Sequence, residues 1–127
     1  MSSPGVVNNR EPYGQVSAAM GGAGTVSFMG WVKNDSTPNE PIELHLYVGG
    51  EKGRVDHCYT GIWSNPSDNT FAATVNVSER GEHNIYLYAI GGSNPEIGRG
   101  TVTIYDANTN RKPQMNFEEC KGGNGRV

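Results

Sequence analysis

The sequence has no apolar run that approaches the roughly 18–20 residues of a membrane-spanning helix, and no amphipathic stretch of helical length. Residues 1–14, MSSPGVVNNREPYG, lack the charged and apolar regions of a signal peptide. The sequence also has no large excess of positive or negative charge, because 13 acidic and 10 basic residues leave a net charge of only −3. We therefore expect no membrane insertion and no nucleic-acid partner, and we expect any export signal to lie outside this sequence.

Cysteine is equally scarce, since Cys58 and Cys120 are the only two. Their separation fits neither the clustered ligands of a zinc site nor a two-residue redox motif, so we expect no metal and no cofactor. The pair is consistent with one disulfide, which would stabilise the fold by roughly 4 kcal/mol in the chain-entropy model. It is equally consistent with two free thiols, and the sequence leaves both alternatives open.

The sequence is rich in turn-forming residues that separate short alternating segments, and 18 glycines and 7 prolines contribute to these turns. In residues 42–48, IELHLYV, one side of the segment carries Ile42, Leu44, Leu46 and Val48, which predicts a half-buried strand. The same period, or a high content of β-branched and aromatic residues, predicts further strands at residues 13–19, 25–32, 55–63, 71–77, 84–90 and 101–105.

About seven strands without intervening helices predict an all-β chain. Parallel β-α-β units are excluded, so antiparallel pairing remains, and two packed sheets bury the alternating faces best. We place this β-sandwich at residues 12–105. Residues 1–11 form an irregular N-terminal segment in this interpretation, and residues 106–127 form an irregular C-terminal tail or linker because their pattern has little periodicity.

Several short motifs follow one another in order along residues 12–105. They are GGAGTV at 21–26, Gly30 with Trp31, IELHLYVGG at 42–50, Phe71 at the start of a strand, GEHNIYLYAI at 81–90 and GRGTVTI at 98–104. This order resembles the immunoglobulin-like repeat modules that are appended to secreted cell-wall hydrolases, glycosidases and adhesins of Gram-positive bacteria. The chain departs from that pattern after Trp31, where Lys33, Asn34 and Asp35 replace an acidic stretch, and again at residues 57–69.

The resemblance implies an immunoglobulin-like antiparallel β-sandwich that is extracellular or attached to the cell surface, with no catalytic residues to carry over. Our first hypothesis is a non-catalytic binding module of a bacterial surface or secreted protein. The expected partners are other domains of the parent chain and either a host protein, with immunoglobulin as one candidate, or a glycan. The alternative is a structural spacer domain with no ligand of its own.

The predicted binding residues lie on the polar sides of two strands. If 42–48 and 84–90 are neighbours in one sheet, their outward residues form one stripe of His45, Tyr47, Tyr86 and Tyr88. Tyrosines offer large, fairly rigid contact area with a hydrogen-bonding tip, which suits a binding surface. The competing interpretation is that these aromatic residues merely fit a pleated surface or are covered by the C-terminal tail.

Two tryptophans each have two interpretations. Trp63 lies in a loop-like stretch, where it either stacks on a ligand or covers one end of the sandwich. Trp31 is out of phase with Val26 and Phe28, so either Gly30 forms a bulge that turns the indole inward or the ring is exposed beside Met29.

A cysteine-nucleophile site at Asp56, His57 and Cys58 is not expected. Consecutive strand residues point to opposite faces, so they cannot form a nucleophile and base within mutual reach. We therefore predict no catalytic residues and a chain that is not an enzyme.

Overall fold

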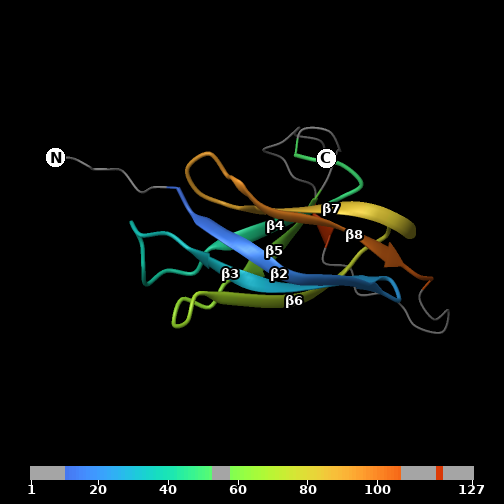
Figure 1. The fold of residues 1–127 in the computed structure, drawn as a ribbon, viewed down its shortest axis with the longest axis horizontal. Helices are drawn as coiled ribbons and strands as arrows, with labels where there is room; N and C mark the ends of the chain where they lie inside the picture. Colours follow the sequence, from blue (N-terminus) through green and yellow to red (C-terminus); the bar gives the residue numbers. More distant parts are fainter. Residues whose placement is uncertain (1–10, 53–57, 107–116, 119–127) are drawn as a thin grey trace.

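A computed structural model of the chain describes residues 11–52, 58–106 and 117–118, and shows two β-sheets packed face to face (Figure 1). All strand pairs in both sheets are antiparallel. The three-stranded sheet has the order β2-β3-β6, with bounds β2 (Tyr13–Gly22), β3 (Thr25–Lys33) and β6 (Thr70–Asn76). The second sheet has the order β8-β7-β4-β5-β9, with bounds β4 (Glu43–Val48), β5 (Cys58–Trp63), β7 (Gly81–Ala89), β8 (Glu96–Ile104) and β9 (Phe117–Glu118).

This architecture confirms the predicted all-β sandwich of about seven strands. β9 is a two-residue addition to the edge of the second sheet, where Phe117 pairs with Tyr59 of β5. Part of the segment predicted to be an irregular tail is thus a short strand. No helix in the described ranges is long and apolar enough to cross a bilayer.

The inward residues of both sheets form one main core, to which every strand from β3 to β8 contributes. The predicted inward side of 42–48 is confirmed, because Ile42, Leu44, Leu46 and Val48 are all buried. Each such side chain contributes about 1.5–3 kcal/mol by leaving water, so this core is the main source of stability. The remaining members are Val26, Phe28, Val32, Tyr59, Ile62, Phe71, Val75, Val77, Ile85, Leu87, Ala89, Ile97, Val102 and Ile104.

The two sheets approach each other most closely where β2 lies against β8. A side chain at Gly21 would overlap the carbonyl oxygen of Thr103, so only glycine allows this backbone contact. Just beyond it, Tyr105 joins the sheets through its backbone: its N–H donates to the Gly22 oxygen at 3.0 Å and its oxygen accepts from the Gly24 N–H at 2.9 Å. The sandwich is therefore closed along this side.

Candidate functional site

The outer face of the second sheet holds the predicted stripe of His45, Tyr47, Tyr86 and Tyr88. β4 and β7 are neighbours, as expected, and their ladder places His45 opposite Tyr88 and Tyr47 opposite Tyr86. The four side chains therefore lie in two adjacent rows on one face of the sheet, on the side away from the main core.

The expectation that the tyrosines of this stripe stand exposed is wrong. Tyr47, Tyr86 and Tyr88 retain only 4%, 9% and 6% of their accessible surface. With Cys58 they form a second apolar cluster, in which the rings of Tyr47 and Tyr88 meet edge to face at 5.2 Å. A ligand can reach these rings only if the groups that cover them move aside.

Two long cationic side chains cover part of this tyrosine cluster. The Lys52 ammonium lies 5.1 Å from the centre of the Tyr88 ring, and the Lys52 backbone N–H donates to the Tyr88 hydroxyl at 3.1 Å. The Arg99 guanidinium lies 4.9 Å from the centre of the Tyr86 ring. The carboxylate of Glu96, 2.6 Å from Arg99 Nε, holds the guanidinium in place and raises its pKa.

Burial also changes the acid-base behaviour of these tyrosines. Loss of solvation raises the pKa of Tyr47 and of Tyr88, because it disfavours the phenolate, and for Tyr88 the Lys52 N–H opposes the effect. The cluster is therefore neutral and apolar at physiological pH. The sequence does indicate that these tyrosines are buried. Residues 84–90, NIYLYAI, form an almost continuous apolar run, which is typical of a strand buried on both faces.

Cys58 lies inside this cluster, fully buried and disulfide-bonded. Cys120, the second cysteine of the sequence, is outside the described residues. Asp56 and His57 are also outside them.

One exposed part of the outer face is a corner at one end of β4 and β5. Trp63 is 56% exposed, and it pairs directly with Glu43 across the ladder. The Glu43 oxygen Oε2 lies 3.3 Å from His45 Nε2 and accepts the Gly61 N–H at 3.2 Å. The other oxygen, Oε1, makes no hydrogen bond to any residue in the described segments.

This corner, formed by Trp63, Glu43 and His45, unites two of the five predicted residues with one that the sequence analysis missed. Glu43 was missed because the alternation in 42–48 gives the face of this residue but not its partner on β5. Trp63 stands on the outer face beside Glu43, with more than half of its surface exposed. Chemically, the corner offers an apolar plane beside a carboxylate that accepts hydrogen bonds.

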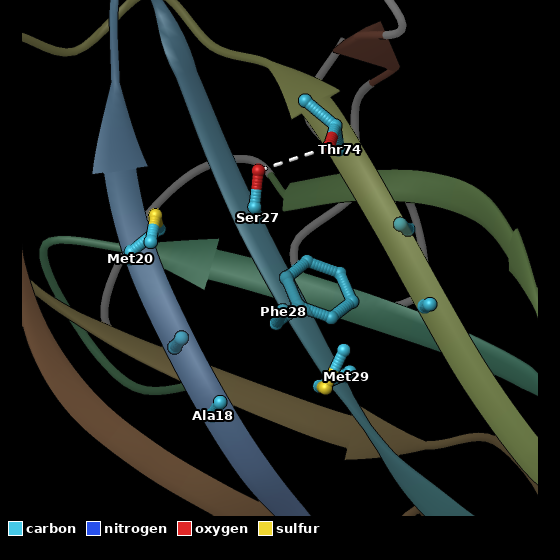
Figure 2. A pocket seen from close by; sticks show the side chains of 9 residues that line it. Ala18, Met20, Ser27, Phe28, Met29 and Thr74 are labelled. Carbon is cyan, nitrogen blue, oxygen red and sulfur yellow. Dashed lines mark hydrogen bonds between the residues drawn. The ribbon is translucent and has the colours of Figure 1, made fainter.

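The outer face of the three-stranded sheet carries a second exposed surface. Figure 2 shows a shallow hollow of about 410 Å³ between β2, β3 and β6, flanked by Met20 and Met29, which are 63% and 50% exposed. Ser27 and Thr74 close one end of it with a hydrogen bond of 2.9 Å between their hydroxyls. None of its lining residues carries a charge. They are Ala18, Ala19, Met20, Ser27, Phe28, Met29, Ala72, Ala73 and Thr74.

Trp31 lies on this same outer face, which settles the two interpretations of its phase. β3 pairs with β6 in an unbroken register, so Gly30 does not form a bulge. The irregularity is in β2, between Val16 and Ala18. The Trp31 ring is half-buried and meets Tyr13 edge to face at 5.9 Å.

Comparisons with known proteins add little to this geometry. No family model matches the sequence, and no curated protein matches it. Among solved structures, the chain is similar to the fibronectin(III)-like modules of Clostridium thermocellum CbhA, at 10% identity and a TM-score of 0.41, over 87% of this chain and 53% of that one. A likeness this distant carries no functional argument. Among the residues with described positions, no group of three or more His, Cys, Asp and Glu side chains could hold a metal ion.

Proposed function

We propose that this chain is a non-catalytic, extracellular accessory module of a bacterial protein, and that it binds a glycan through the corner of Trp63, Glu43 and His45. The exposed Trp63 ring carries the proposal. More than half of this ring is in contact with water, so its burial against a ligand would remove apolar surface from water and would favour binding.

The neighbours of Trp63 favour a sugar over a flat apolar partner. A sugar ring presents C–H groups on its faces and hydroxyls around its rim, so it needs an aromatic plane with hydrogen-bonding groups beside it. Glu43 supplies a carboxylate in the next strand, and His45 Nε2 lies 3.3 Å from its oxygen Oε2. Hydrogen bonds to a charged acceptor are about twice as strong as neutral ones.

An accessory role agrees with the buried tyrosine cluster on the outer face of the second sheet. Tyr47, Tyr86 and Tyr88 fill the middle of the outer face, which leaves the binding corner at its end and makes the sheet beneath it rigid on both sides. A module that presents one exposed ring on a stiff support loses little conformational entropy on binding.

The test is a glycan array with neutral microbial, plant and mucin oligosaccharides, followed by tryptophan fluorescence titration with whichever oligosaccharide binds. Trp63→Ala should weaken binding about tenfold or more, as expected for an aromatic hot spot, and Glu43→Gln should weaken it less. Trp31→Phe is the matched control, because it removes the only other tryptophan, on the opposite sheet.

Each outcome of this test is decisive. If binding quenches the fluorescence of the Trp31→Phe variant but no longer that of Trp63→Phe, the corner is the site. Unchanged affinity in Trp63→Ala would contradict the proposal. An array without any signal would instead favour a structural spacer with no ligand of its own. Capture of a host protein that carries no glycan would indicate that the partner is a protein.

A further inference from the structure

The edge of β6 differs from the other sheet edges, because no described residue blocks it from pairing with a further strand. The edge of β5 is paired with β9. β2 lies against β8 at the Gly21 contact and carries an irregularity at Val16 and Ala18. β8 carries the charged pair of Glu96 and Arg99. In the part of the chain that the structure describes, no strand pairs with β6 on the side away from β3, and Figure 1 shows β6 along the margin of its sheet.

The register shows which backbone groups of β6 point to this open edge. Val77 N donates to Gly24 O and Val32 N donates to Asn69 O, both at 2.9 Å. Hydrogen-bonded positions alternate along an antiparallel pair, so Phe71, Ala73 and Val75 direct their backbone groups to β3. Thr70, Ala72 and Thr74 direct theirs away from it.

Thr70 is already satisfied, whereas Ala72 and Thr74 are not. The Thr70 N–H donates to the Asp68 carboxylate at 3.1 Å, and its oxygen accepts the Asn65 N–H at 2.8 Å. This leaves the N–H and C=O groups of Ala72 and Thr74 without a protein partner among the residues described. A row of such groups is a template for another strand.

The sequence of β6 carries none of the features that normally block such pairing. Residues 70–77, TFAATVNV, contain no charged residue, no proline and no glycine, and pair with β3 without a bulge. The side chains of Ala72 and Thr74 are small and exposed on the uncharged hollow beside Met29. An identical edge from another molecule therefore meets neither charge repulsion nor a bulky obstacle.

We propose that β6 is a self-association edge, at which a second copy of this chain adds its own β6 in antiparallel orientation. With the twofold axis at Ala73, Ala72 of one copy exchanges both backbone hydrogen bonds with Thr74 of the other, and the reverse pair does the same. A closed twofold contact of this kind uses the same patch on both copies. The two three-stranded sheets join into one sheet, with the uncharged hollows on the same side.

Sedimentation velocity of the full, disulfide-intact chain tests the pairing, over dilutions from about 1 mM to about 1 µM. The wild type should shift from monomer to dimer as concentration rises. The double variant Ala72→Lys, Thr74→Lys should associate at least about tenfold more weakly, because it places like charges opposite each other. Thr103→Lys, an exposed position on β8, is the matched control and should dimerise like the wild type.

Amide hydrogen exchange of the wild type gives a readout that does not depend on any variant folding. The amide protons of Ala72 and Thr74 should exchange more slowly at high than at low concentration, while that of Thr103 stays unchanged. The proposal is overturned by a monomer throughout the dilution series, by a dimer that tolerates both lysines, or by a dimer in which these two amides keep their exchange rates. None of these results bears on glycan binding at Trp63.

Discussion

Replacing Tyr59 with phenylalanine removes one hydroxyl from a ring that is otherwise fully buried in the main core. That hydroxyl donates to Glu79 Oε1 at 2.7 Å and accepts the Ser78 backbone N–H at 3.0 Å. It thus ties the segment after β6 to β5. The ring itself stays in place in the variant, so the core keeps its volume and only the polar contacts are lost.

The expected loss follows from those two bonds. A hydrogen bond to a charged group contributes about 1.5–3 kcal/mol, and a neutral one about 0.5–1.5 kcal/mol. Both are only partly buried, so water replaces some of what is lost. We expect Tyr59→Phe to lower the free energy of unfolding by about 2 kcal/mol, which for a domain near 100 residues lowers Tm by about 10 °C.

Urea denaturation followed by circular dichroism measures this difference, with Tyr105→Phe as the matched control. Tyr105 is 58% exposed, and its hydroxyl makes no hydrogen bond to the described residues. Its replacement should change the unfolding free energy by no more than about 0.5 kcal/mol. If Tyr59→Phe were as stable as Tyr105→Phe, the bonds to Glu79 and Ser78 would not contribute as the geometry requires.

Three further outcomes follow from other features. Burial raises the pKa of Tyr59 to about 12 from an ordinary value of 10. The contribution of the neutral Tyr59 side chain to folding stability is therefore fully present below pH 10 and is lost as pH rises through 12. The free energy of unfolding of the wild type should fall across this range, and that of Tyr59→Phe should fall less. Gly21→Ala should cost about 1–3 kcal/mol because its side chain meets the Thr103 backbone, whereas Gly100→Ala, where nothing lies within 4 Å, should leave the denaturation midpoint within experimental scatter. Reduction of the Cys58 disulfide should lower stability by about 2–4 kcal/mol and weaken the near-ultraviolet dichroism of the tyrosine cluster; an unchanged spectrum and midpoint would show that the bond does not hold this cluster.

The period-two pattern predicted most of the fold, because side-chain direction in a strand is fixed by local geometry. It located β4 within one residue, and it placed Tyr47 and Tyr86 on the same side of the sheet once β4 and β7 were taken as neighbours. It could not show what covers a face. Lys52 reaches Tyr88 from a turn 36 positions earlier in the chain, a contact that no local pattern contains.

The candidate site was predicted only in part for the same reason. Exposure of Trp63 depends on where β5 ends, and the role of Glu43 depends on the register between β4 and β5, which contains an irregularity beyond Leu44. Similarly, a bulge at Gly30 was one of two interpretations of the phase of Trp31, whereas the irregularity lies in β2. Local residue types indicate that a strand deviates, but long-range packing decides which strand takes up the extra residue.

The backbone link at Tyr105 has a mechanical consequence. β2 begins at Tyr13 at one end of the sandwich and runs in the same direction as β8, which ends beside Tyr105 at the other end (Figure 1). Tension applied between these two points pulls the strands past each other lengthwise and loads the bonds of Tyr105 to Gly22 and Gly24 together instead of one after another. A domain connected in this way resists stretching along its long axis.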